Sequence, residues 1–391
     1  MIQSILVYTL IILVMLLFAN IAKRKAVYQT GQYGELVQKR SFWSFEIVFM
    51  LLFFALMFGM RYDVGTDHLG YLFSYIEGSV GEDLRMEPLF RWISKICYDL
   101  NIHPIIYFAI WAFIQITFFL LAFKNERYLF PSLITFLFFN LSFTFWMNGI
   151  RQALAMCIWL YSITFIVEKK FWHYIIGGII AFLFHRSALI LFVFYPLLRN
   201  GKDYFKSIPL QLILFASVFI IKNVFEVFIL QLEPIIEQFQ TILGGEDNLY
   251  ATYTMDNMLD ELNREVGGTG LAYMFRILVW IIIILYSRKL KSYYNSKKFN
   301  IIYFFFFFGL LTQYIFPEGI IILARPFCYF PVFQTIMLAY FVYYLFRSNS
   351  FRFNRLLAYA LIIAFIGVFY LNMLGATERS SILFQFYFQK M

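Results

Sequence analysis

The stretch IVFMLLFFALMFGM (residues 47–60), followed directly by RYDVGTDHLGY (residues 61–71), governs the interpretation of the whole chain. The first part carries no charge, whereas the second brings an arginine, two aspartates and a histidine close together. Its two glycines permit tight turns, and Asp63 and Asp67 would share one face of a helix. Such a cluster is either a solvated cap on a membrane helix or part of a functional site, and the other charged residues must distinguish the two.

The composition places the chain in a membrane. Hydrophobic residues make up 62% and charged residues only 14%, against about 25% charged residues in a soluble domain. Apolar runs of about 20 residues recur along the chain, each long enough to cross a bilayer core of about 30 Å. The runs are continuous and do not alternate with polar residues, which excludes a transmembrane β-barrel. We therefore predict an all-α polytopic membrane protein.

The net charge of +9 does not indicate a nucleic-acid partner. In a membrane protein, basic residues set the topology instead. The cysteines Cys97, Cys157 and Cys328 show no metal-binding spacing, and two of them lie in apolar runs. The N-terminus has neither a basic residue before its apolar run nor a small-residue cleavage site, so residues 1–20 are expected to be a retained first helix. We expect no metal and no cofactor.

The apolar segments predict about twelve transmembrane helices within a single integral membrane domain, residues 1–391. A basic segment follows the first helix, so that segment is expected inside and both termini outside. The inner loops of this topology hold most of the 32 Lys and Arg residues and few of the 23 acidic residues. The predicted spans are residues 5–21, 42–60, 104–123, 129–146, 153–167, 174–184, 188–198, 210–221, 273–286, 301–316, 320–346 and 356–374.

Two segments of this topology are long, polar and external. Residues 61–101 form an external motif loop, acidic on balance, whose apolar residues from Leu89 to Ile96 recur as in an amphipathic helix lying on the membrane surface. Residues 226–271 form a large acidic external loop domain, punctuated by glycine pairs, that would suit a lid. Both segments would cover the outer face.

Several polar groups then fall near the outer ends of helices. Ionisable residues at membrane depth are costly and usually face a cavity, although each one alone could equally be a snorkelling or capping residue. Arginines in number favour a diphosphate or another anion, and a nearby carboxylate or histidine could act as general base. The groups are Arg61, Asp63 and Asp67; Glu87; Asn148, Arg151 and Gln152; His185 and Arg186; and Arg325.

The donor substrate is expected to be lipid-linked. The chain contains no G-x-x-x-x-G-K-[ST] motif and no other Gly-rich phosphate loop on the cytoplasmic side. A soluble nucleotide donor thus has no obvious binding place, whereas a donor held in the outer leaflet would reach the polar groups. A divalent metal between Asp63 and Asp67 is not predicted, because two carboxylates are too few.

The ordered motifs resemble the EpsG-like family, which groups with the Wzy-type polymerases of bacterial O-antigen, capsule and exopolysaccharide pathways. The resemblance covers most of the chain, and its specific motifs lie within residues 61–189; Arg325 matches by position more than by motif. The motifs are RYDVGTD at 61–67 with Tyr71, EPLF at 87–90, NGIRQALA at 148–155, HRSAL at 185–189 and Arg325.

The resemblance implies a transferase of the bacterial cytoplasmic membrane that works on its periplasmic or extracellular side. It would release the growing glycan from undecaprenyl diphosphate and join it to the distal sugar of an incoming lipid-linked repeat unit. Expected partners are the lipid-linked oligosaccharide, membrane lipid, and the flippase and chain-length regulator of the same pathway. The expected roles are diphosphate binding by Arg151, Arg186, Arg325 and Arg61, general base for Asp67, Asp63 or His185, and sugar binding by Glu87, Asn148 and Gln152.

Two other classes of protein would also use such residues. A flippase for lipid-linked oligosaccharide would carry arginines in an aqueous cavity, but it should show polar groups along a transit path and internal repeats. A polysaccharide O-acyltransferase could use His185 as base, but it would need an acyl donor reached from the cytoplasm. Neither a polar path nor a repeat is visible in the sequence, so the polymerase is favoured.

Overall fold

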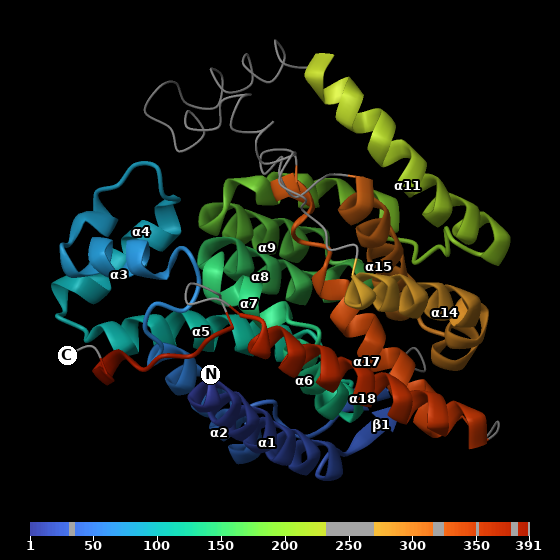
Figure 1. Ribbon diagram of the computed structural model, residues 1–391, viewed down its shortest axis with the longest axis horizontal. Coiled ribbons are helices and arrows are strands. Elements are labelled where there is room, and N and C mark those ends of the chain that lie inside the picture. Colours follow the sequence, from blue (N-terminus) through green and yellow to red (C-terminus); the bar gives the residue numbers. More distant parts are fainter. Residues whose placement is uncertain (31–35, 232–269, 316–323, 349–351, 377–381, 390–391) are drawn as a thin grey trace. The chain divides into compact units, whose positions relative to one another are not determined.

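The structure is a computed structural model that describes residues 1–30, 36–231, 270–315, 324–348, 352–376 and 382–389 (Figure 1). The chain, expected to form one membrane domain, falls into two compact units. The first unit comprises Met1–Asn200 and Thr335–Met391, and the second comprises Gly201–Gln334. Each unit is described by itself.

The first unit consists of helices that carry the long apolar segments, with short 3-10 helices between them. Its α-helices are α1 (Ile2–Arg24), α2 (Phe45–Gly59), α3 (His68–Ile76), α4 (Pro88–Asp99), α5 (Pro104–Leu121), α6 (Phe130–Phe139), α7 (Ser142–Asn148), α8 (Ile150–Val167), α9 (Phe171–Phe184), α10 (Phe194–Leu198) and α18 (Arg352–Leu374). Its 3-10 helices are η1 (Ser79–Gly81), η2 (Arg127–Leu129), η3 (Arg186–Val193) and η5 (Tyr387–Gln389).

The second unit contains α11 (Ile208–Gln231), α14 (Leu271–Tyr294), α15 (Lys297–Ile315) and η4 (Arg325–Phe327). Helix α17 (Val332–Arg347) begins in this unit and belongs to the first from Thr335 onward. Helix α11 packs against α14 and α15. The ammonium of Lys291 lies 2.7 Å from Oδ1 of Asp203 and 4.2 Å from the ring centre of Tyr303, so its charge is compensated within this unit.

Helix α8 forms the core of the first unit and packs against α5, α7 and α9. Most of its side chains are buried. A Cβ at Gly177 of α9 would lie 2.0 Å from Oγ of Ser162, so only glycine lets α9 approach α8 this closely. The indole N–H of Trp159 donates to the hydroxyl of Tyr174 at 3.0 Å. The two helices are therefore tightly joined.

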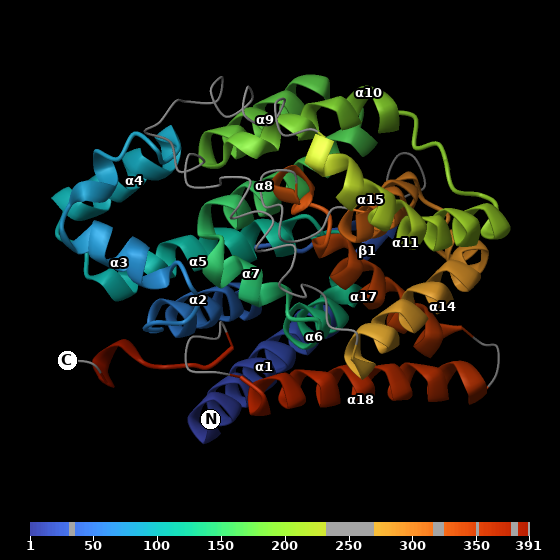
Figure 2. The same cartoon turned by 45° about the horizontal axis from the view of Figure 1, so that its top comes forward.

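Helices from opposite ends of the chain lie side by side in the first unit. Figure 2 shows the C-terminal end of α18 meeting the N-terminal part of α1, and the hydroxyls of Thr9 and Tyr370 lie 2.8 Å apart there. The ring of Tyr8 on α1 also packs edge-on against Phe369 of α18, with the centroids 6.1 Å apart. Because each helix has an apolar surface along its length, this contact buries residues that are far apart in the sequence.

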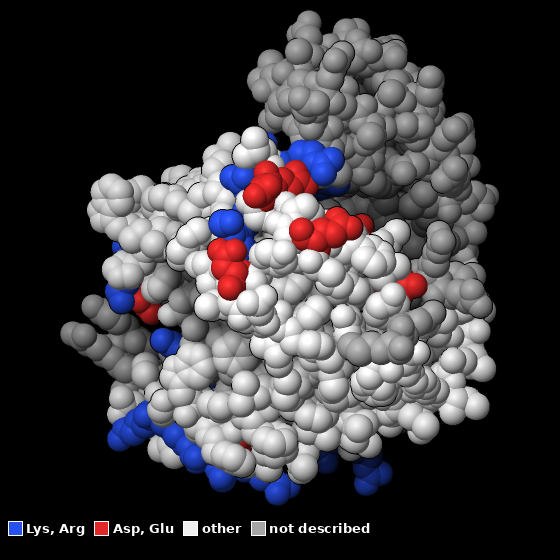
Figure 3. Space-filling model, turned by 90° about the vertical axis from the view of Figure 1, so that its left-hand side faces the viewer, with Lys and Arg blue, Asp and Glu red and all other residues white. Residues whose placement is uncertain are grey.

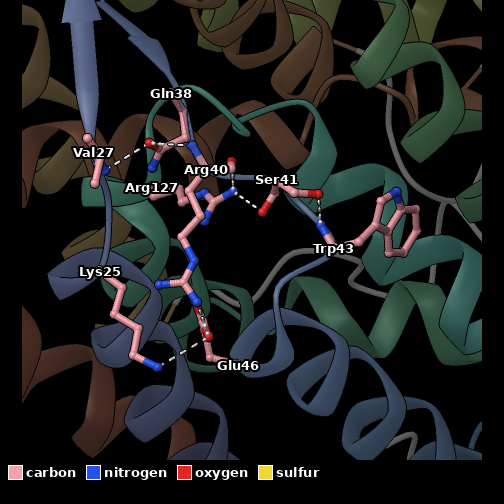
Figure 4. A network of polar contacts seen from close by, with 8 residues as sticks. All are labelled: Lys25, Val27, Gln38, Arg40, Ser41, Trp43, Glu46 and Arg127. Carbon is pink, nitrogen blue, oxygen red and sulfur yellow. Dashed lines mark hydrogen bonds and ion pairs between the residues drawn. The ribbon is translucent and has the colours of Figure 1, made fainter.

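A small β-hairpin, not predicted from the sequence, connects α1 to α2. Its strands β1 (Tyr28–Thr30) and β2 (Leu36–Gln38) pair antiparallel, with Tyr28 opposite Gln38. Figure 4 shows how side chains tie this connection together: Oε1 of Gln38 accepts from the backbone N–H of Val27 at 2.8 Å. Arg127 is fully buried and donates through Nη2 to the carbonyls of Arg40 and Ser41, each at 2.7 Å.

Glu46 is an acidic residue near the start of the predicted span 42–60. Its carboxylate is buried, with 1% of the side chain exposed, and it pairs with Arg40 at 3.3 Å and Lys25 at 3.6 Å (Figure 4). A carboxylate in the first turn of a helix is also favoured by the helix dipole. The charge at the start of α2 is thus neutralised by basic residues, as a charge at a membrane boundary requires.

The chain is an all-α multi-pass membrane protein. Among the described residues, 7 helices are long and apolar enough to cross a membrane, or up to 8 when one bent pair counts as a span. The others among the twelve predicted segments are shorter apolar helices: Phe45–Gly59, Phe171–Phe184, Arg186–Leu198 and Ile208–Ile221. The prediction of about twelve spans is therefore supported for 7 or 8 of them within the described residues.

Two predicted spans differ in shape from a straight helix. The segment 129–146 is bent by 66° between Phe139 and Ser142, where Leu141 adopts a left-handed φ of 61° and the side chain of Asn140 donates to Thr335. The segment 188–198 begins as 3-10 helix and becomes α-helical only at Phe194. Of the predicted acidic loop 226–271, residues 232–269 lie outside the described residues.

Candidate active site

Arg151, in the first turn of α8, lies among residues from two other helices. Its Nη1 donates to Oε2 of Glu87, which directly precedes α4, and its Nε donates to the hydroxyl of Tyr71 on α3 at 3.1 Å. The side chain of Arg151 is 16% exposed and that of Glu87 is 6% exposed. Charge-assisted hydrogen bonds in such a shielded place are stronger than on the surface, so this ion pair fixes the orientation of the guanidinium.

The second carboxylate oxygen of Glu87 holds a different segment. Oε1 accepts from the backbone N–H of Arg186 at 3.2 Å, at the start of η3. Glu87 therefore joins α8 and η3, although Arg151 and Arg186 lie 64 and 99 positions away in the chain. The side chain of Arg186 is exposed, so its guanidinium is available to a ligand arriving from outside the protein.

The neighbouring residues of η3 form a second group beside this ion pair. Nδ1 of His185 lies 2.7 Å from Oγ of Ser187, and Nε2 of Gln152 donates to the same hydroxyl at 3.4 Å. His185 and Gln152 are each 7% exposed. The first turn of α8 therefore reaches the start of η3 directly through Gln152 and, by way of Glu87, through Arg151.

Arg61 is placed differently from the other predicted site residues. It is 2% exposed, and its Nη1 and Nη2 donate to the carbonyls of Phe58 at 2.9 Å and Met147 at 3.2 Å. These carbonyls lie in the last turns of α2 and α7, where a cation is favoured by the helix dipole. Burial lowers the pKa of Arg61 to about 10, so it stays cationic at neutral pH. Such a guanidinium links two helix ends and is not directed at a diphosphate in solvent.

The aspartates of this motif lie in the loop that follows Arg61. Asp63 is half-buried with a left-handed φ of 50°, and Asp67 is exposed. The backbone N–H of Asp67 donates to Oδ1 of Asn148 at 3.0 Å. Gly65 has a φ of 95°, and a Cβ added there would lie 3.0 Å from the same Oδ1 atom. Asn148 thus holds this loop against the end of α7, two residues before α8 begins.

His68, the first residue of α3, is fully buried, and neither ring nitrogen has a hydrogen-bond partner within the described residues. Its ring centroid lies 4.5 Å from that of Phe108, and the guanidinium carbon of Arg61 lies 5.2 Å from the same Phe108 ring. Burial, and secondly the charge of Arg61, lower the pKa of His68 to about 2. His68 is therefore neutral at all physiological pH values.

Residues near the C-terminus pair with the backbone that precedes the aspartates. The N–H of Tyr62 donates to the carbonyl of Gln385 at 2.9 Å, and the N–H of Tyr387 donates to that of Met60 at 2.8 Å. Arg61 and Phe386 form the antiparallel bridge between them. The motif is thereby held from both sides, by α7 and by the segment 382–389.

The face that carries α3 and α4 has a mixed charge. Figure 3 shows acidic and basic side chains gathered close together in the upper part of this face, among uncharged ones. Asp83 accepts from Nε and Nη2 of Arg85 at 2.8 and 3.0 Å, and this hydrogen bonding lowers the pKa of the Asp83 carboxyl. Both charges therefore persist across the neutral range, and neither side chain is deeply buried.

Arg325 belongs to the second unit, where it begins η4 and its carbonyl accepts from the N–H of Cys328 at 3.3 Å. Its side chain is half-buried. Its predicted role in diphosphate binding stays a prediction. No three His, Cys, Asp or Glu residues lie together as metal ligands would in the described ranges.

Three groups that contact the predicted motifs were not predicted as part of the site. They are the Tyr71 hydroxyl, the Ser187 hydroxyl and the backbone of residues 385–387. Tyr71 lies in the motif at 61–71 and Ser187 lies in the motif at 185–189, so membership of these motifs was the available signal. The pairing of 385–387 with Met60 and Tyr62 left no sequence signal, because backbone pairing depends little on side-chain identity.

This geometry defines a class: a multi-pass membrane protein in which arginines, a buried carboxylate and a histidine from separate motifs meet at the end of its central helix. Comparison with protein-family models then matches the EpsG family over residues 44–387, so the chain belongs to the EpsG family. This membership links it to exopolysaccharide biosynthesis. No curated protein and no solved structure matches the chain.

Proposed function

We propose that the chain is a polysaccharide polymerase that joins undecaprenyl-diphosphate-linked repeat units at the outer face of the bacterial cytoplasmic membrane. The growing glycan is transferred to the distal sugar of an incoming lipid-linked unit. The observation that carries this proposal is the meeting of Glu87, Arg151 and the segment 185–187, which come from three separate motifs. Membership of the EpsG family supports the same pathway.

The chemistry is a direct displacement at the anomeric carbon of the donor glycan. A hydroxyl oxygen of the acceptor sugar forms the new bond to this carbon, and the bond from the carbon to the diphosphate oxygen breaks. Undecaprenyl diphosphate leaves with the bonding electrons, the hydroxyl proton passes to the general base, and the anomeric configuration is inverted. Asp67, Asp63 or His185 is the base.

The arginines meet the charge of the leaving group. Arg186 offers an exposed guanidinium, and Arg151 has donors in addition to those held by Glu87 and Tyr71. Guanidinium groups suit phosphate geometry and stabilise negative charge that develops in the transition state. Arg325 is proposed to bind diphosphate as well, and Gln152 and Asn148 to bind sugar. Arg61 contributes by holding the ends of α2 and α7 together.

The test uses purified full-length protein, lipid-diphosphate-linked repeat units and gel analysis of chain length. The unaltered chain should give a ladder of products. Asp67→Asn and Arg151→Ala should each slow its formation about 100-fold or more, as loss of a general base or of a charge-stabilising donor does. Arg199→Ala, an exposed arginine outside the motifs, is the matched control and should give the full ladder.

Three results would contradict the proposal. Full polymer length from Asp67→Asn, His185→Ala and Arg151→Ala would remove these residues from the site. Absence of a ladder from the unaltered chain, with labelled lipid moving between the leaflets of liposomes, would make this protein a flippase. Transfer of an acyl group to the glycan would make it an O-acyltransferase.

A further inference from the structure

We propose that Glu87 and Tyr71 are positioning residues, which hold Arg151 and the start of η3 in place for an anionic diphosphate headgroup. This assignment rests on the proposed function, and it replaces the expected role of Glu87 as a sugar ligand. Neither residue has to touch the substrate for this role, because Tyr71 acts through the guanidinium of Arg151 and Glu87 acts through that guanidinium and the backbone N–H of Arg186.

The hydrogen bonds of Arg151 carry the first step. Tyr71 accepts from Nε at 3.1 Å and its ring centre lies 6.0 Å from the guanidinium carbon, while Glu87 accepts from Nη1. Two edges of one planar group are thus held by residues from two different segments. A guanidinium has five N–H donors, so donors remain for a phosphate in a direction that Glu87 and Tyr71 set.

Both carboxylate oxygens of Glu87 already accept hydrogen bonds within the protein. Oε2 accepts from Arg151 and Oε1 accepts from the backbone N–H of Arg186. With 6% of its side chain exposed, Glu87 offers little surface to a sugar hydroxyl. A sugar ligand would have to displace one of these bonds, and breaking a shielded charge-assisted bond is unfavourable. The geometry therefore favours a role within the protein.

The charges carry the third step. Glu87 compensates the charge of Arg151, so this pair adds directed donors and little net charge. The bond from Arg186 N–H to Glu87 holds the start of η3 while the Arg186 side chain stays exposed. Arg186 is thus the cation that remains for the ligand, and Arg151 supplies hydrogen bonds in a set direction. A shorter carboxylate side chain at position 87 should therefore disturb both Arg151 and Arg186.

The test distinguishes the effect of side-chain length at position 87 from the effect of its charge. Glu87→Asp keeps the negative charge but is one methylene shorter, so it cannot serve both donors, and Tyr71→Phe keeps the ring but loses the hydroxyl. Binding of farnesyl diphosphate to the full chain in detergent is measured by calorimetry, with inorganic diphosphate in parallel to separate headgroup recognition from binding of the lipid tail. Each variant should bind about 5- to 10-fold more weakly. Glu82→Asp and Tyr98→Phe, exposed positions of the same segment, should bind as the unaltered chain does.

The decisive measurement repeats both changes in an Arg151→Ala background. If Tyr71 acts through Arg151, Tyr71→Phe should not weaken binding by more than about twofold there, and Glu87→Asp should keep only the smaller effect that runs through the backbone N–H of Arg186. A further five- to tenfold loss for Tyr71→Phe in that background, or an undiminished loss for Glu87→Asp, would overturn the proposal, because it would show an effect that does not pass through Arg151. Tyr71→Phe keeps the test decisive if Glu87→Asp fails to fold.

The remaining outcomes are also distinguishable. An unaltered chain that binds neither probe overturns the positioning proposal. Binding with the expected non-additivity but without polymer synthesis overturns the proposed function and leaves the positioning roles supported. Polymer synthesis with independent effects of Glu87→Asp and Arg151→Ala supports the function and overturns the positioning roles.

Discussion

The two glycines of the 61–71 motif should respond in opposite ways to the same substitution. Gly65 has a φ of 95°, and its added Cβ would lie 3.0 Å from Oδ1 of Asn148. Gly70 lies within α3, and its added Cβ would meet nothing within 4 Å. The pair is therefore a matched comparison between a constrained and an unconstrained glycine in one motif.

The magnitudes follow from these two environments. At Gly65, an alanine in a left-handed conformation costs about 1–2 kcal/mol. Displacing Asn148 also loses its bond from the Asp67 N–H, another 0.5–1.5 kcal/mol or so. Gly65→Ala should therefore destabilise the protein by about 1.5–3.5 kcal/mol. Gly70→Ala should stabilise it by about 0.5–1 kcal/mol, because alanine loses less backbone entropy in a helix.

The assay is unfolding of each full-length variant by titration with sodium dodecyl sulfate in mixed micelles, followed by tryptophan fluorescence. The free energies of unfolding should rank Gly70→Ala, unaltered chain, Gly65→Ala, from most to least stable. The polymerisation assay should show loss of long products only for Gly65→Ala, because this loop carries Asp63 and Asp67. Equal destabilisation by both substitutions, or none at Gly65, would refute the reasoning from φ and from the Asn148 contact.

Two further predictions concern pH and topology. Burial lowers the pKa of His68 to about 2 in the folded protein, while a histidine in the unfolded chain has a pKa of about 6.5. Above about pH 6.5 His68 is neutral in both states, so its contribution to the free energy of unfolding does not change with pH. Below that pH the unfolded state takes up the proton first, so stability should fall by about 1.4 kcal/mol per pH unit. His68→Leu should flatten this slope, whereas His173→Gln, at an exposed histidine, should not. Equal slopes for the unaltered chain and both variants would contradict the assignment of this pH dependence to buried His68. In a chain without its native cysteines, Glu82→Cys should react with a membrane-impermeant maleimide on intact cells and Lys39→Cys only after permeabilisation, whereas the reverse pattern would overturn the orientation.

Sequence periodicity predicted the helices well where the apolar run alone sets the element. The segment 104–123 became α5 at Pro104–Leu121, since a continuous apolar run flanked by polar residues satisfies both the bilayer and the backbone. It failed where tertiary contacts decide. Asn140 bonds Thr335 from far along the chain beside the bend at Leu141, and no local pattern encodes that partner.

The motifs also indicated which residues would meet, but not how. Glu87, Arg151 and the start of η3 do come together, and polar residues in an apolar chain must find partners. The same rule did not reveal that Arg61 bonds two helix-end carbonyls while Arg151 bonds Glu87 and Tyr71.

The sequence by itself determined the class of the protein and some of the polar residues of the candidate site, such as Glu87, Arg151 and His185, because hydrophobicity and charge are properties of single residues. Only the tertiary structure decided which donor meets which acceptor. Side-chain direction depends on how helices pack and where the backbone bends, and these depend on contacts between residues such as Met60 and Tyr387 at opposite ends of the chain.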